Sequence, residues 1–191
     1  MLEGVFFFLS PELVLSSINN DRVCHPRYGA SDALHVVGGL TIRPLAEVCA
    51  AVAAMGFTVV RLPFSSEMLR LGTAAVTPRA VDFGLNPALR GKTPLEVLDA
   101  VVDGLGAAKV AVVLNNHTTL GMWSGGVEAN GLWFQEAEKD GSGGGGGGGG
   151  GTYTEARWVA DWVMLARRYQ GRPWVVGYDL RNEVRAVTKI K

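Results

Sequence analysis

The stretch Val175-Val176-Gly177-Tyr178-Asp179-Leu180-Arg181-Asn182-Glu183-Val184 decides how the rest of the chain is interpreted. Its apolar first half predicts a buried strand, and that strand ends on a polar pair, Asn182 and Glu183. In a parallel α/β enzyme, residues at the C-terminal ends of strands face the active site. A carboxylic acid beside an amide that can bind a hydroxyl suits general acid catalysis on a sugar or ester oxygen. The alternative is a structural role, in which Glu183 starts a helix or pairs with Arg181 or Arg185 at the surface.

Ahead of this stretch, strand-like and helical patterns alternate along the chain. Apolar residues recur at helical spacing in three segments, two of them with capping-box starts, at residues 44–55, 93–105 and 152–169. Short apolar runs typical of strands lie before and between them, at residues 34–37, 57–62 and 109–114. Strands that alternate with helices form a parallel sheet with right-handed crossovers, so this order predicts an α/β fold.

Two α/β architectures fit this alternation, an open doubly wound sheet and a (β/α)8 barrel. The sequence has no Gly-x-Gly-x-x-Gly between a predicted strand and a helix, which disfavours a nucleotide-binding protein. Arg61 stands near the end of the run at 57–62, and Pro63 is expected to close that strand. Taken alone, Arg61 marks either the lip of a cleft or a structural ion pair.

The composition is that of an ordinary globular protein. The chain has 191 residues, of which 48% are hydrophobic and 19% charged, enough for one sizeable core. The formal net charge is zero and the basic residues are scattered, which argues against a nucleic-acid partner. No apolar run approaches the ~18 residues that a membrane span needs. Cys24 and Cys49 have no metal-site spacing, and they are either buried thiols or one disulfide.

One domain is expected over residues 34–191, preceded by a weakly defined segment at residues 1–33. Within that first segment, residues 13–15 are an alternative to residues 34–37 as the first strand. The domain is interrupted at residues 141–151, where Ser142 is followed by nine glycines. Poly-glycine has maximal backbone entropy and buries no side chain, so this insertion is expected to be disordered.

Four pieces of the chain follow one another in an order that points to a known family. They are Met55–Ser65 with Arg61, Thr93–Asp99, Leu114–His117, and Asp179–Glu183 with its Asn-Glu pair. Together these pieces, between about Tyr28 and Arg185, resemble glycoside hydrolase family five, the cellulase-like clan of (β/α)8 barrels. The resemblance implies an α/β fold that covers roughly the first four βα units of such a barrel.

The resemblance also implies a retaining mechanism on a β-linked polysaccharide or glycoside. In that scheme Glu183 is the acid/base, Asn182 binds the 2-hydroxyl of the sugar at the cleavage point, and His117 contacts the same sugar. Arg61 would hold the carboxylate of the nucleophile ionised and in place. The chemistry requires two carboxyls ~5–5.5 Å apart and neither a cofactor nor a metal. A polysaccharide substrate would favour an extracellular or vacuolar location.

Two tryptophans in the segment that follows residue 115 are candidate sugar platforms. Trp123 and Trp133 could stack on sugar rings, because apolar ring faces favour aromatic surfaces. Packing of the loop against the rest of the fold is the alternative for both residues.

A complete barrel takes roughly 250 residues, so the family's nucleophile, on a later strand, is expected to be absent from this chain. Asp179 is not a substitute, since it is expected to point along the sheet rather than across the cleft. We therefore expect residues 1–191 to be inactive alone and to need a C-terminal half-barrel as a partner. The alternative is a non-catalytic half-barrel fragment or a weak carbohydrate-binding pseudoenzyme.

Overall fold

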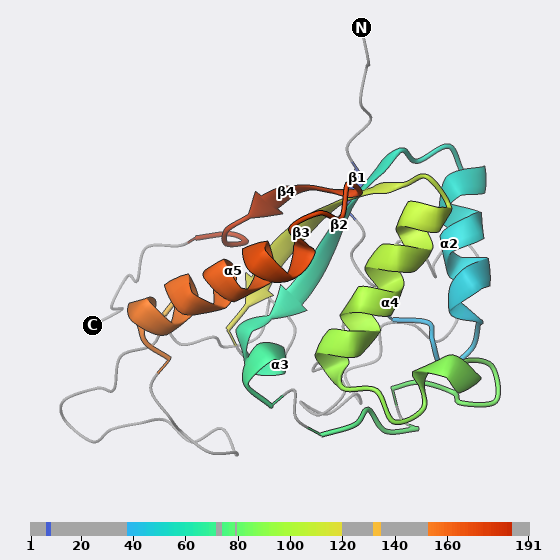
Figure 1. Cartoon of the computed structure of the whole chain (residues 1–191), viewed down its shortest axis with the longest axis horizontal. Helices are drawn as coiled ribbons and strands as arrows, with labels where there is room; N and C mark the ends of the chain where they lie inside the picture. The colour runs from blue at the N-terminus through green and yellow to red at the C-terminus, as the bar shows by residue number, and fades with distance from the viewer. Residues whose placement is uncertain are drawn as a thin grey trace, which may run out of the picture.

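Four parallel strands form the centre of the molecule (Figure 1). The structure, a computed structural model of the chain, describes residues 7–8, 38–71, 74–78, 80–119, 132–134 and 153–184. The strands are β1 (Phe7–Phe8), β2 (Val59–Ser65), β3 (Ala111–Thr118) and β4 (Val175–Asp179), and they neighbour one another in the order of the sequence. Each adjacent pair is parallel, as the alternation of elements predicts.

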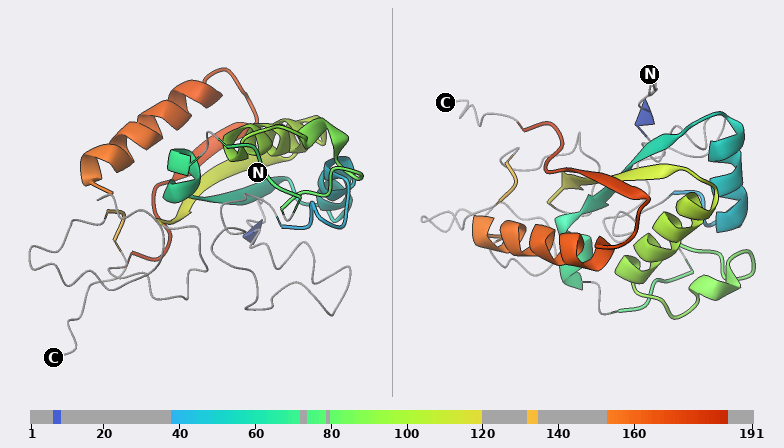
Figure 2. Two further views of the ribbon diagram at one scale, coloured as in Figure 1. Left: turned by 90° about the horizontal axis from the view of Figure 1, so that it is seen from below. Right: turned by 45° about the horizontal axis from the view of Figure 1, so that its top comes forward.

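Helices lie between successive strands. They are α2 (Leu45–Ala54), α3 (Ser66–Leu71), α4 (Pro94–Ala107) and α5 (Glu155–Tyr169), with a short 3-10 helix η1 at Pro87–Leu89. Figure 2 shows α4 and α5 over the same face of the sheet, and α2 beside α4. A doubly wound sheet reverses its strand order and covers both faces, whereas sequential order with helices on one face is typical of successive βα units in a barrel.

The two faces of the sheet differ in chemistry because side chains alternate along a strand. The helix-facing set is apolar and at most 4% exposed, and it comprises Val60, Leu62, Phe64, Val112 and Leu114. These side chains belong to the single core cluster, which also contains residues of α2, α4 and α5. Arg61, Asn115 and Asp179 occupy the other face, so the sheet separates the hydrophobic core from a polar inner surface.

The helix starts follow the capping signals in the sequence. At α4 the Glu96 carboxylate accepts from the Thr93 backbone N–H at 2.7 Å, and Thr93 Oγ1 accepts from the Glu96 N–H at 3.3 Å, which confirms the predicted capping box. The Thr93 hydrogen bonds lower the pKa of Glu96. At α5 the cap is Thr154, whose Oγ1 accepts from the Arg157 N–H, and not Thr152 as predicted.

Three predicted boundaries around the strands are wrong. Strand β2 continues through Pro63 to Ser65. In the described part of the chain β1 pairs with β2 at Val60 and Arg61 alone, so no described ladder bond requires the N–H that Pro63 lacks. Strand β3 continues to Thr118 through the polar residues expected beyond its end. Helix α3 forms in a stretch to which the sequence analysis assigned no helix or strand. In the first turn of α3, Ser65 Oγ accepts from the Met68 N–H at 3.1 Å.

Two exposed regions also differ from the sequence analysis. Strand β4 is not fully buried, since Val176 is 58% exposed and Tyr178 39%; in the described part of the chain β4 pairs on one side only, with β3. On α5, Val159 and Val163 of the predicted apolar face are exposed, while Leu165 is buried.

Some predictions fall partly on residues that the structure does not describe. The first described strand is Phe7–Phe8, two residues that the sequence analysis did not assign to an element. Residues 13–15, 34–37 and 141–151 lie outside the described residues. Cys49 is a free buried thiol, and burial raises its pKa to about 11. Cys24 lies outside the described residues. Among the helices that the structure describes, none is long and apolar enough to cross a membrane.

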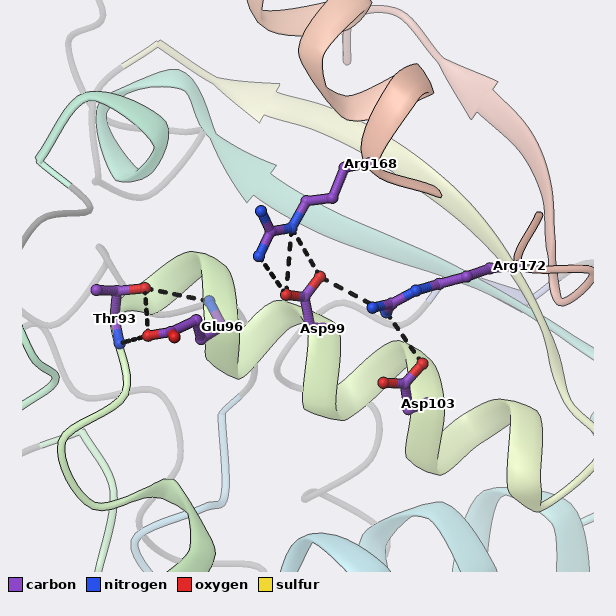
Figure 3. A network of polar contacts seen from close by, with 6 residues as sticks. All are labelled: Thr93, Glu96, Asp99, Asp103, Arg168 and Arg172. Atoms are coloured by element: carbon purple, nitrogen blue, oxygen red, sulfur yellow. Dashed lines mark hydrogen bonds and ion pairs between the residues drawn. The ribbon is translucent and has the colours of Figure 1, made fainter. Parts of the chain in front are cut away.

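An ion-pair network joins α4 to α5 (Figure 3). The Asp99 carboxylate on α4 pairs with Arg168 on α5 through both Nε and Nη2, and with Arg172 at 3.6 Å. Arg172 Nη1 also lies 3.0 Å from Asp103, one turn further along α4. The Asp99 side chain is 15% exposed and the Asp103 side chain 62%, so the two aspartates share a cation but differ in solvation.

We expect Asp99→Asn to lower the free energy of unfolding by about 1–3 kcal/mol, because it leaves a partly buried arginine without its anion. Asp103→Asn is the matched control and should change stability by less than about 0.5 kcal/mol, since its pair is exposed to solvent. Urea denaturation followed by circular dichroism measures both values. Equal losses in the two variants would contradict this account of the network.

Candidate active site

Polar side chains from β2, β3 and β4 meet on the inner face of the sheet. Arg61 of β2 is in register with Val113 of β3, and Asn115 of β3 is in register with Asp179 of β4. Paired residues of neighbouring strands point to the same face, so Arg61, Asn115 and Asp179 face the same side. His117 lies two residues beyond Asn115 on the same face and strand. The sheet register therefore assembles these groups towards the C-terminal strand ends.

Arg61 spans β3 to reach Asp179. Because β2 and β4 both flank β3, their backbones are about 10 Å apart, a gap that a long side chain can cross. Arg61 Nε donates to Asp179 Oδ2 at 2.6 Å, and Arg61 Nη2 lies 2.6 Å from the same oxygen. The side chains are 16% and 32% exposed. The expectation that Asp179 points along the sheet is wrong, since the period of the strand directs it over β3 towards Arg61.

Asn182 joins this pair to His117. Arg61 Nη2 donates to Asn182 Oδ1 at 2.9 Å, and Asn182 Nδ2 lies 3.5 Å from His117 Nε2. The other ring nitrogen, His117 Nδ1, is 2.8 Å from Asn115 Oδ1. Three residues that the sequence analysis selected, far apart in the chain, thus form one contiguous set of polar contacts.

Glu183 follows Asn182 directly and is exposed. Its backbone has φ 42°, in the left-handed region that residues other than glycine seldom adopt. Burial lowers the pKa of His117, and the negative charge of Glu183 opposes that shift. The acid candidate therefore lies within electrostatic reach of the imidazole, at the turn that follows β4.

The net effect of the site on His117 is to favour its neutral form. Burial is the largest cause and lowers the pKa of His117 below its ordinary value, and the positive charges of Arg61 and Arg181 act in the same direction. Glu183 and Asp179 oppose the shift; the effect of Glu183 is smaller than those of burial and Arg61, and that of Asp179 is the smallest of the five. A neutral imidazole keeps one ring nitrogen as a hydrogen-bond acceptor.

Asn116 and Ser66 support the turn after β4 from the opposite face of the sheet. The Asn116 carbonyl oxygen accepts from the Asn182 N–H at 2.9 Å, and Asn116 Oδ1 accepts from Arg181 Nη1 at 3.2 Å. Asn116 Nδ2 donates to Ser66 Oγ at 2.9 Å, and both residues are at most 1% exposed. The sequence analysis gave neither residue a role, although a polar pair at the end of an apolar strand was the available signal.

Of the two tryptophans proposed as sugar platforms, the structure describes Trp133 and not Trp123. Trp133 Nε1 donates to Glu155 at the start of α5 at 3.1 Å, and its ring packs against Phe134 and Trp158 with centroid distances of 5.6 and 5.9 Å. These contacts are those of loop packing, and stacking on a sugar stays a prediction. Trp123 lies outside the described residues. Nowhere in the described ranges do three His, Cys, Asp or Glu side chains form a group that could hold a metal ion.

Parallel strands in sequential order with helices on one face define a (β/α)-barrel type of protein, and comparison with known proteins gives the family. A family model described as Cellulase (glycosyl hydrolase family 5) matches residues 33–190. The chain belongs to glycosyl hydrolase family 5.

Individual relatives are named as endoglucanases. The chain is 33% identical to the major extracellular endoglucanase of Xanthomonas campestris pv. campestris over 156 residues, which are 82% of this chain and 28% of the relative. It is 28% identical to an endoglucanase of Paenibacillus polymyxa over 156 residues, 82% of this chain and 34% of that protein. The chain thus spans about a third of the length of the curated relatives it matches.

A solved structure gives the same fold. The complex of an endocellulase from Pyrococcus horikoshii with cellotetraose superposes with a TM-score of 0.64 at 25% identity, covering 85% of this chain and 37% of that one. The structure is therefore a partial (β/α)8 barrel, in which parallel strands alternate with helices.

We expect NMR titration of the His117 ring to give a midpoint below its ordinary value of about 6.5, because burial and Arg61 disfavour the imidazolium. As the pH falls, His117 is therefore protonated at a higher pH in the unfolded chain than in the folded protein. The stability that the neutral ring contributes is present above the unfolded pKa and is lost as the pH falls towards the folded pKa.

Denaturation at about pH 7.5 and about pH 5.5 should therefore show a larger loss of stability in the wild type than in His117→Asn. Equal losses in the two proteins, or a titration midpoint above the ordinary value, would contradict the described environment of His117.

Proposed function

We propose that the protein hydrolyses β-1,4-linked glucan or a related β-glycoside, with Glu183 as the acid/base. The observation that carries this proposal is the contiguous set of Arg61, Asn182 and His117 beside Glu183 at the strand ends of a family 5 barrel. The substrate class is supported by the endoglucanase names of the relatives and by the cellotetraose complex of the Pyrococcus horikoshii endocellulase.

The chemistry proposed for the site has two steps. In the first, a second carboxylate attacks the anomeric carbon while Glu183 gives its proton to the glycosidic oxygen of the departing group. In the second, Glu183 takes a proton from the water that attacks the anomeric carbon and displaces that carboxylate. Asn182 binds the 2-hydroxyl of the reacting sugar, and His117 contacts that sugar. Arg61 supplies a fixed positive charge that keeps a neighbouring carboxylate ionised. Such preorganised charge stabilises a transition state without reorganisation at the moment of reaction.

We further propose that the nucleophilic carboxylate comes from a later βα unit that docks against β4. The proposal is supported by the share of the relatives that this chain spans and by exposed apolar side chains along and beyond β4, namely Val176, Tyr178, Leu180 and Val184. A further strand and helix would bury these groups, and burial of apolar area contributes about 25 cal/mol per Å². The partner in this proposal is the C-terminal half of the same barrel.

In a protein that contains the complete barrel, Glu183→Gln should reduce cleavage of β-glucan by roughly 10²–10⁴-fold, since a glutamine cannot donate the proton. In kcat/KM, which reports the steps up to departure of the leaving group, the loss should be much smaller on an aryl glycoside whose acidic leaving group departs without protonation. Glu47→Gln is the matched control, because Glu47 lies on α2 and pairs only at the surface with Arg43 at 3.6 Å.

These rates are measured by reducing-sugar release and by absorbance of the aryl product. If Glu183→Gln reduced kcat/KM equally on both substrates, or reduced neither, Glu183 would not be the general acid.

A polypeptide of residues 1–191 by itself should show no cleavage of β-glucan or of aryl β-glucosides, because retaining hydrolysis needs a second carboxyl ~5–5.5 Å from the first. Addition of the C-terminal half as a separate polypeptide should restore activity if the two halves associate through β4.

Cleavage by the isolated polypeptide would contradict this proposal, because it would require a second carboxylate within residues 1–191. Binding of cello-oligosaccharides by the isolated polypeptide, with no activity after complementation, would favour the non-catalytic carbohydrate-binding alternative.

A further inference from the structure

The polar contacts across β2, β3 and β4 have a direction. Arg61 has only donors, and it is the one member whose role in a hydrogen bond is fixed by its chemistry alone. The Asp179 carboxylate accepts a hydrogen bond from the Arg61 guanidinium. This ion pair holds the guanidinium above β3 and balances its positive charge. Arg61 Nη2 then presents an N–H to Asn182 at 2.9 Å.

The orientation of the Asn182 side chain follows from this contact. An amide presents its oxygen on one side and its NH2 group on the other, so an oxygen that accepts from Arg61 leaves Nδ2 towards His117. Nδ2 can only donate. His117 Nε2, at 3.5 Å, must therefore be the unprotonated nitrogen of the ring for this contact to be favourable.

The proton of a neutral His117 is then on Nδ1, where Asn115 Oδ1 accepts it at 2.8 Å. In the other neutral tautomer the proton would be on Nε2. The Nε2–H would then face the Asn182 Nδ2–H, so that two donors would lie against each other. Asn115 is 0% exposed, and its Nδ2 has no hydrogen-bond partner among the residues that the structure describes. Asn115 therefore accepts from His117 although this orientation leaves its own buried NH2 group unpaired.

We propose that Asp179 is a positioning residue that fixes His117 in the Nδ1–H tautomer, acting through Arg61 and Asn182. Asp179 does not touch the ring. It anchors the guanidinium that orients the Asn182 amide, and the amide selects the tautomer. The charged groups that act on the ring come from β2 (Arg61), from β4 (Asp179) and from the turn after it (Arg181 and Glu183).

The catalytic consequence rests on the proposed function, whereas the hydrogen-bond order does not. An unprotonated Nε2 on the inner face would accept a hydrogen bond from a sugar hydroxyl, in place of the 3.5 Å contact with Asn182 Nδ2, and could not donate one to it. The Asn182 amide would likewise be held in one orientation before substrate arrives. Preorganisation of this kind reduces the cost of ordering the site on binding.

Long-range ¹H–¹⁵N NMR of the protein tests the proposal, because the two ring nitrogens give different shifts when protonated and unprotonated. The His117 signals are assigned by their loss in His117→Asn. In the wild type near neutral pH, Nδ1 should be protonated and Nε2 unprotonated. In Asp179→Asn the Arg61 anchor is lost and the Asn182 amide can turn over, so Nδ1–H should cease to be the major form.

Two further variants make the test specific. Asp99→Asn is the matched control, since it also removes an aspartate from an arginine ion pair but lies between α4 and α5, and it should leave the His117 tautomer unchanged. Asp179→Glu keeps the carboxylate and should retain the Nδ1–H form. Circular dichroism and near-ultraviolet spectra establish that each variant is folded.

A wild-type His117 protonated on Nε2 would overturn the proposal without the need for any variant. So would a folded Asp179→Asn protein with an unchanged tautomer, even if its activity were lost, and that result would leave the proposed function standing. Conversely, the expected change of tautomer, together with no glycoside cleavage by a protein that contains the complete barrel, would refute the function and support the hydrogen-bond order.

Discussion

The site depends on one cation that crosses a strand. Arg61 lies on the central part of a parallel sheet, where its side chain is only 16% exposed, and a cation there requires anions or carbonyl-type oxygens within reach. Asp179 and Asn182, which both come from the β4 end of the chain, supply them. The contact therefore ties the β4 turn to β2 without any backbone pairing between the two strands.

The sheet makes this contact possible because it holds two chemistries apart. Apolar residues on the helix side bury the core that fixes the spacing of β2, β3 and β4, and the inner side is left for polar groups. Behind the turn, Asn116 and Ser66 are buried with hydrogen bonds to Arg181 and to each other. Buried polar groups that are paired in this way cost little and restrict the turn to one arrangement. Glu183 is consequently presented from a backbone that is held on both faces of the sheet.

Much of the architecture could be predicted from local patterns. The capping box at Thr93, the helical spacing of α2, α4 and α5, and the apolar run before Asn115 are properties of short segments, and the structure confirms the elements they predict. Boundaries were predicted less well, because they depend on neighbouring strands: in the described residues β1 pairs with β2 at Val60 and Arg61 alone, and β2 continues through Pro63. Tyr178 is exposed because β4 is paired on one side only in the described residues.

The sequence by itself determined the class of fold and the residues of interest, since periodicity and motif order are carried by the chain and Arg61, His117, Asn182 and Glu183 could be selected from them. Only the tertiary structure decided which groups meet. Asp179 was set aside from the sequence, yet it is the anion of Arg61, because strand register and the two-residue period place residues 118 positions apart on one face. The direction of the hydrogen bonds also depends on the tertiary structure. The orientation of the Asn182 amide follows from its contact with Arg61, and the proposed tautomer of His117 follows from its contact with Asn182.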